Sequence, residues 1–389
     1  MQLIYFRILR SVAAGMLIVI FPYFILNNFS HSSLLLGFLY AAGTITTALA
    51  GALFGLLFDR HPTKILVIIV NGFLAIGLWI LVFGDHSILL IFIASALGGF
   101  SATGSIAGGG VGGVAAPIQN AVAARIIPET ERTNAYTTLM FIGGITSIIG
   151  IITAGFLNIE VIFAISATLA TLSIIPLILL PQKTFRPIIK IAHDGRRKAL
   201  RDFSITGVLN GLSQGLIIPF LIPFFFLIYH VSSAQMSVYA SIGGALAILA
   251  ILAAPWLDKN FGLVKSMILT RGIGILAVIA LPLIHYFPLA IFIYLITPAL
   301  RIMALPVQQR AITSIAGEGD VATVLGFNQS TRLLAASGGS AIAGYFFENA
   351  LISFPFYGYA IIAGGNLLLY KKFFGNLRGN KIGTEKSKN

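Results

Sequence analysis

The chain has 389 residues, of which 57% are hydrophobic and only 10% are charged. A soluble domain carries about 25% charged residues, and a globular protein of this size has too much surface for so few charges. The composition therefore excludes a soluble protein and indicates a polytopic membrane protein. The absence of cysteine excludes disulfides and thiolate metal sites. The net charge of +13 is interpreted as a topology signal and not as a nucleic-acid-binding signal.

The first apolar run follows two basic residues, Arg7 and Arg10, as it would in a signal peptide. No small-residue cleavage site leads into a soluble domain, so we expect a retained membrane helix. A crossing needs roughly 20 apolar residues, and breaks at charged residues, Pro and Asn/Ser clusters predict twelve spans in all. These are about 4–27, 34–57, 65–84, 88–126, 133–157, 161–181, 203–229, 235–256, 264–285, 288–314, 321–347 and 352–372.

The basic residues predict the orientation of these spans. With the N-terminus placed inside, the six outer loops contain no Lys or Arg, and basic residues accumulate on the cytoplasmic side of membranes. Both termini are therefore expected in the cytoplasm. The stretch 182–202 carries seven Lys/Arg and two Asp. It is interpreted as a linker, partly an amphipathic basic helix on the anionic inner leaflet. Residues 373–389 are expected to be a disordered basic tail.

The two parts of the chain that flank the linker resemble each other. Asp258 lies 199 positions after Asp59 in a similar context, and Pro306-Val-Gln308 lies 189 positions after Pro117-Ile-Gln119. Two parallel six-helix repeats joined by a long loop are one way to build a transporter. The difference between the two offsets places about ten extra residues of the first repeat between 88 and 117.

That interval contains the run GGGVGG, residues 108–113. Gly108, Gly110 and Gly113 match the spacing of a dinucleotide-binding fingerprint, but the required strand and βαβ unit are missing because the run lies inside a membrane span. Two alternatives stay open. The glycines allow close helix packing, or they mark a break in a fourth span whose 39 residues would be about 58 Å long as one helix.

At the ends of the second and eighth spans, the chain resembles a major facilitator superfamily transporter. The motif of that family, G-x-x-x-D-R/K-x-G-x-R/K-R/K, is matched in part in the first repeat and more loosely in the second. The matching residues are Gly55, Asp59, Arg60, Lys64, Asp258 and Lys259. A second family-like run, Pro117 to Ala135, joins the fourth and fifth spans. The fourth-span arginine and the fifth-span proline of proton antiporters are missing.

The resemblance implies an all-α polytopic membrane protein of twelve helices, arranged as two pseudo-symmetric six-helix bundles. We expect bundles at 1–181 and 203–372. It also implies that the motif residues form a cytoplasmic gate, although ordinary topology-determining charges would look the same.

Polar side chains inside membranes mark functional sites by default. Arg301 lies 13 residues into the tenth span, and Arg332 lies about 11 residues into the eleventh. Two pairs of residues share a helix face by their spacing of four. The candidate substrate-binding residues are Arg301, Arg332, Asn328, Asn210, Gln214, Gln119 and Gln308. Guanidinium groups facing a cavity would favour an anionic or strongly hydrogen-bonding solute; alternatively, they bond helix-end carbonyls or amides.

The predicted function is secondary, non-ATP transport of a small organic, anionic solute by alternating access. The alternatives are a proton-coupled drug or metabolite efflux antiporter and a membrane receptor or lipid-handling protein on the same fold. Hydrolase and P-loop motifs are missing, so we expect no enzyme. We expect no cofactor, no metal and no nucleic acid. The partners are a small-molecule substrate and the lipid bilayer, and the protein is expected to be a monomer in the cell (plasma) membrane.

Overall fold

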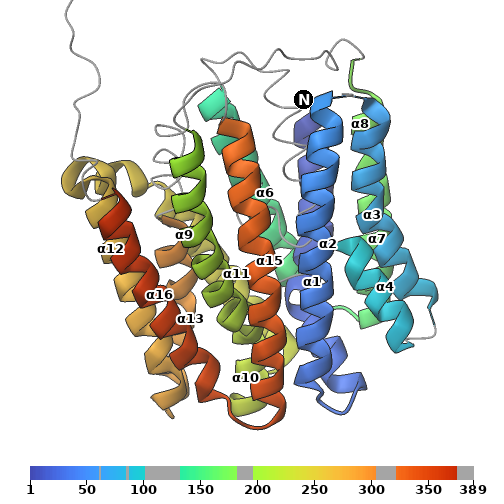
Figure 1. The fold of residues 1–389 in the computed structure, drawn as a ribbon. Coiled ribbons are helices and arrows are strands. Elements are labelled where there is room, and N and C mark those ends of the chain that lie inside the picture. Colours follow the sequence, from blue (N-terminus) through green and yellow to red (C-terminus); the bar gives the residue numbers. More distant parts are fainter. Residues whose placement is uncertain (61–62, 85–86, 101–131, 182–195, 304–320, 375–389) are drawn as a thin grey trace, which may run out of the picture.

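The computed structural model describes the chain apart from residues 61–62, 85–86, 101–131, 182–195, 304–320 and 375–389. Every regular element in the described ranges is helical, and twelve rods follow one another (Figure 1). The first six are α1 (Gln2–Asn28), α2 (Ser33–Arg60), α3 (Lys64–Phe83), α4 (Ile88–Gly98), α6 (Arg132–Ala154) and α7 (Ile159–Leu172) with α8 (Ile174–Ile178). The second six begin with α9 (Arg196–Ile217), η4 (Ile218–Phe220) and α10 (Leu221–Tyr229) as one rod. They continue with α11 (Ser233–Ile251), α12 (Ala254–Ala280) with η5 (Leu281–Leu283), α13 (Phe287–Met303), α15 (Val321–Glu348) and α16 (Ser353–Phe374).

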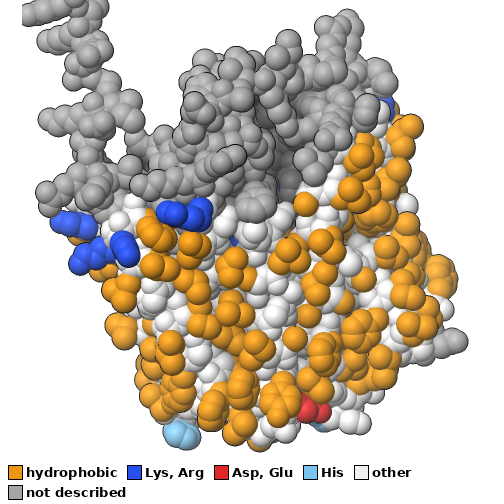
Figure 2. Space-filling view, viewed as in Figure 1, with side chains coloured by type: hydrophobic (Ala, Val, Ile, Leu, Met, Phe, Trp, Pro, Cys, Tyr) orange, Lys and Arg blue, Asp and Glu red, His pale blue; other side chains and the backbone are white. Residues whose placement is uncertain are grey.

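The rods run between two ends of the bundle. The termini end holds the start of α1 and the end of α16. The hairpin end holds the short loops after α1 and α15 (Figure 1). On the face shown in Figure 2, the Lys and Arg side chains gather towards the termini end, and hydrophobic side chains cover the surface between the two ends. Seven described helices are long and apolar enough to cross a membrane by length and composition. The exposed apolar belt is the surface that lipid would cover.

The same helix pairs pack in both halves of the chain. In the first half α1 contacts α6 and α7, α3 contacts α4 and α7, and α2 contacts α4. In the second half α9 contacts α15 and α16, α12 contacts α13 and α16, and α11 contacts α13. The halves meet where α2 packs on α15 and α6 packs on α11. The expected architecture, two pseudo-symmetric six-helix bundles, is confirmed.

Glycines allow the closest helix crossings in both halves. Gly15 of α1 lies against the Ser147 backbone of α6, and Gly215 of α9 lies against the Ala336 backbone of α15. Gly215 is 200 positions after Gly15, so the repeat preserves the crossing. Small residues let helix backbones approach, and in lipid this packing supplies much of the association energy.

The fourth helix ends well before the glycine run. α4 has only 11 residues, about 16 Å, and a bilayer core is roughly 30 Å thick. Gly99 follows it in the left-handed region with φ 62°, and its amide and that of Phe100 both bond the Ser95 carbonyl. Gly108, Gly110 and Gly113 lie outside the described residues, so their role stays a prediction.

Two helix starts differ from the expected boundaries. α12 begins at Ala254, which places Asp258 and Lys259 inside a helix and not in a loop. The Ser266 hydroxyl donates to the Leu257 carbonyl over 2.9 Å. Residues nine apart would be about 13 Å apart on a straight helix, so α12 bends sharply between them. α9 begins at Arg196 and continues into the seventh span, so residues 196–202 of the expected linker extend a transmembrane rod and do not form a separate surface helix.

Two adjacent glycines of α15 test the role of the crossings. A Cβ at Gly339 would come within 2.5 Å of the Leu212 carbonyl oxygen, whereas a Cβ at Gly338 meets nothing within 4 Å. We expect Gly339→Ala to lower stability by about 1–3 kcal/mol through overpacking. Gly338→Ala should be neutral or stabilising because alanine favours helix. Thermal unfolding in detergent measures both variants, and equal melting temperatures would contradict the close crossing.

Candidate functional site

A chain of polar side chains joins α9 and α15 inside the second bundle. The Gln214 amide donates to Asn210 Oδ1 over 3.1 Å, and Arg332 donates to Gln214 Oε1 over 3.3 Å. A second Arg332 nitrogen donates to Gln329 Oε1 over 2.9 Å. The crossing is close because Gly211, one turn from Gln214, lies against the Arg332 backbone. The amide oxygens therefore hold the guanidinium in place without neutralising its charge.

Two further arginines lie close enough to act on Arg332 electrostatically. These are Arg301, in the last turn of α13, and Arg271 of α12. The Arg271 guanidinium lies over the Tyr370 ring, 5.0 Å from its centroid, a cation–π arrangement. Arg301 interacts electrostatically with Tyr294 and Tyr359. Helices α12, α13 and α15 thus gather three like charges, and α13 and α16 place tyrosines around them. We name these charges the arginine cluster: Arg271, Arg301 and Arg332.

Acidic side chains are scarce in the candidate membrane spans that the structure describes. Among the seven candidate spans of the described chain, only the one at Ile159–Ile178 contains an acidic residue, Glu160, in the first turn of α7. Glu348 is the last residue of α15. The described residues hold no group of three or more His, Cys, Asp and Glu side chains that could bind a metal ion. The arrangement can therefore attract and orient negative charge.

The first bundle buries its own pair of arginines in α1. Arg7 and Arg10 are 9% and 4% exposed, and Arg7 lies beside Gly143 of α6. In the sequence these residues look like flanking charges of the first span. Their spacing of three places both on one helix face, and the contact of Arg7 with α6 is a tertiary feature that this spacing does not predict. Arg271 was also missed, although counting six residues from Lys265 places it about 9 Å into the apolar span that begins there.

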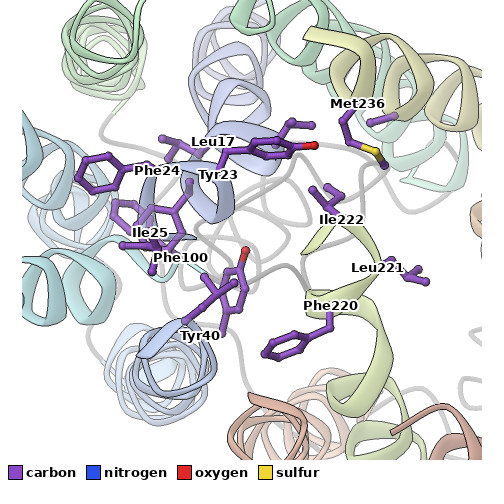
Figure 3. Packing of buried hydrophobic residues seen from close by; sticks show 14 of the residues in the cluster. Leu17, Tyr23, Phe24, Ile25, Tyr40, Phe100, Phe220, Leu221, Ile222 and Met236 are labelled. Atoms are coloured by element: carbon purple, nitrogen blue, oxygen red, sulfur yellow. The ribbon is translucent and has the colours of Figure 1, made fainter. Parts of the chain in front are cut away.

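The hairpin end is closed by a continuous apolar cluster from both halves. Figure 3 shows Leu17, Tyr23 and Phe24 of α1 and Tyr40 of α2 in one cluster with side chains of η4, α10 and α11. The Tyr23 hydroxyl donates to the Val231 carbonyl over 2.5 Å across the two halves. Any solute at the arginine cluster is therefore separated from the hairpin end.

The structure brings together only part of the residue set expected from the sequence. Asn210, Gln214, Arg301 and Arg332 lie in or next to one polar region. Gln119 and Gln308 lie outside the described residues. The expected gate residues lie on three helices. Gly55, Asp59 and Arg60 lie in the last turns of α2, and Lys64 is the first residue of α3. Asp258 and Lys259 lie in α12. The side chains of Asn328, Gly55, Asp59, Arg60, Asp258 and Lys259 lie outside the described part.

Two packed six-helix bundles with a polar interior define a secondary membrane transporter. The model of the Major Facilitator Superfamily matches residues 5–339. The chain belongs to this superfamily, whose members are integral membrane transporters and not enzymes.

Solved structures share the fold at low sequence identity. A D-xylose-proton symporter is 16% identical, with 95% of this chain and 96% of that chain covered and a TM-score of 0.73. The nucleoside transporter NupG is 16% identical, with 97% and 98% covered and a TM-score of 0.72. The human organic anion transporter MFSD10 is 12% identical, with 95% and 97% covered and a TM-score of 0.68. No curated protein sequence matches the chain significantly.

Substitutions at Gln214 test whether it holds Arg332. Gln214→Leu removes an acceptor from a charged donor and should lower stability by about 1.5–3 kcal/mol. Gln214→Glu keeps an acceptor and adds a charge opposite Arg332, so it should unfold at or above the wild-type temperature. Thermal unfolding in detergent compares the two variants. If they melt together below the wild type, the contact to Arg332 does not stabilise the fold.

Proposed function

We propose that this transporter carries a small organic solute with negative charge, bound at the arginine cluster of the second bundle. The observation that supports this most is that Arg271 and Arg301 both lie within electrostatic reach of Arg332, while the candidate spans of the described chain hold so few acidic residues. Like charges repel strongly in a medium of low dielectric constant. An anionic solute would relieve that repulsion and accept charge-assisted hydrogen bonds from the guanidinium groups.

The amide chain gives the site its orientation. Arg332 is fixed by Gln214 and Gln329, so its remaining N–H groups are preorganised for a planar acceptor such as a carboxylate. Tyr294 and Tyr359 lie within electrostatic reach of Arg301, and the Tyr370 ring lies against Arg271, so aromatic side chains border the proposed site. The related folds named above carry a sugar, nucleosides and organic anions, so the fold leaves the solute open and the proposal depends on these side chains.

Alternating access is the proposed mechanism. The basic termini end faces the cytoplasm and the hairpin end faces outside, since the described hairpin loops carry no Lys or Arg. With the hairpin end closed, the solute reaches the arginine cluster from the cytoplasmic side. The motif residues Asp59, Arg60, Lys64, Asp258 and Lys259 form the gate on that side in the opposite state. The membrane that we propose for this protein is the plasma membrane.

Arginine substitutions test the proposed site. Arg301→Ala and Arg332→Ala each remove a charged donor, worth about 1.5–3 kcal/mol, so affinity should fall roughly tenfold or more. A thermal-stability screen of the purified protein against anionic and neutral metabolites identifies stabilising solutes, and uptake into proteoliposomes follows for those solutes. Lys371→Ala, which removes an exposed cation at the end of α16, is the control. If Arg301→Ala changes neither uptake nor solute-induced stabilisation, Arg301 does not bind the solute.

We further propose that transport is facilitated diffusion or exchange without proton coupling. Proton relays in membranes use Asp, Glu or His, and the described spans carry Glu160 at a helix start instead of a deep carboxylate. Proteoliposomes with an internal pH dye should show no solute-dependent proton flux after a pH jump. A solute-dependent proton flux above that of protein-free liposomes would establish proton coupling, and a proton flux opposite in direction to the solute flux would establish the antiporter alternative. Lipid movement without any solute would indicate a lipid-handling protein.

A further inference from the structure

One carboxylate connects the two bundles at the hairpin end. Glu348, the last residue of α15, reaches the start of α2 in the other half. Its Oε2 accepts from the Leu34 backbone N–H over 3.0 Å, and its Oε1 accepts from the Ser32 hydroxyl over 3.4 Å. The Ser32 oxygen in turn accepts from the Leu35 N–H over 3.2 Å. The start of α2 is therefore capped partly by its own half and partly by the opposite half.

The physical basis of this contact is the polarity of a helix start. The first N–H groups of a helix have no partner within the helix, and the helix dipole adds partial positive charge there. A carboxylate satisfies one N–H group and complements this charge. Glu348 is the described acidic side chain that does this across the two halves.

The backbones of the same two helices, α2 and α15, are in close contact one helical turn away from this carboxylate. Gly344 of α15 and Gly37 of α2 leave no space between them, since a Cβ at Gly344 would come within 2.8 Å of the Ser33 carbonyl oxygen. Nearby, the His31 ring stacks on Phe226 of α10 at 5.7 Å between centroids. These contacts join the two halves at the hairpin end. They can form only while the two bundles are close together at that end.

We propose that Glu348, with Ser32 and Leu34, forms a hairpin latch that holds the outer side of the transporter shut. When the bundles separate at this end, the start of α2 loses a cap and Glu348 loses two donors. The latch therefore stabilises the outward-closed state relative to the outward-open state. This role depends on alternating access but not on the charge of the solute.

Distance measurements between spin labels test the latch, and the absence of native cysteine makes labelling specific. Leu157 in the first half and Leu351 in the second are 41% and 42% exposed near the hairpin end, and neither side chain belongs to the latch. The double variant Leu157→Cys/Leu351→Cys, in lipid nanodiscs without solute, reports the ratio of open to closed outer sides by double electron–electron resonance.

Removing the charge should favour opening. Glu348→Ala should raise the open-to-closed ratio about two- to fivefold, from the size of a helix-terminus interaction, and Glu348→Gln should raise it less because it keeps an acceptor. Glu160→Gln, which neutralises another carboxylate at the hairpin end, should leave the ratio unchanged. Unchanged distances in both Glu348 variants, or an equal shift in Glu160→Gln, would overturn the latch.

A steric variant provides a second measurement at the same contact. Gly344→Ala should push α2 and α15 apart and raise the open-to-closed ratio in the same direction. Gly338→Ala on the same helix meets nothing within 4 Å and is its control. Unchanged solute binding in the arginine variants, together with an intact latch response, would reject the proposed solute site alone. A normal solute response with no Glu348 effect would reject the latch alone.

Discussion

Lipid supplies no hydrogen-bond partners, and this constraint shapes the whole molecule. Backbone groups are satisfied within helices, and the interruptions occur where protein covers them. At Gly99 the chain turns through a positive φ and the freed amide bonds Ser95. The Ser173 amide bonds Leu169 between α7 and α8. Pro219 in η4 is buried. Helix ends inside the bundle are therefore features of the protein interior and not of the lipid-facing surface.

The same constraint applies to the arginines, which lie on interior helix faces. In the second bundle, Arg332 of α15 crosses α9 at Gly211. In the first bundle the roles are exchanged, because Arg7 is on α1 and the glycine, Gly143, is on α6. Gly143 lies 189 positions before Arg332, the offset that relates the two repeats in this region. The backbone thus keeps its symmetry while the charge is placed differently in each half. This asymmetry places all of the proposed solute-binding arginines in one bundle.

Helix α15 carries both an arginine of the arginine cluster and the carboxylate of the proposed hairpin latch. α15 carries Arg332 near its middle and Glu348 at its end, 16 residues or about 24 Å apart. Along this length it packs against α9 of its own bundle and α2 of the other. A rotation of one bundle against the other therefore changes the contacts of α15 with α2 while those with α9 persist. Tight glycine crossings favour this rigid-body behaviour, since close-packed interfaces transmit displacement without deforming.

The sequence by itself determined the class of protein and its twelve helical rods, and it predicted the depth of Arg301 and Arg332. Transfer from water to lipid depends on local composition, and depth follows from counting residues at about 1.5 Å each. It could not show that Glu348 would meet Leu34, because those residues are more than 300 positions apart and the contact needs two helices to be docked. Nor could it distinguish Gly338 from Gly339, which differ only in what faces them. Such contacts were decided by the tertiary structure, since they depend on how helices that are distant in the sequence dock against one another.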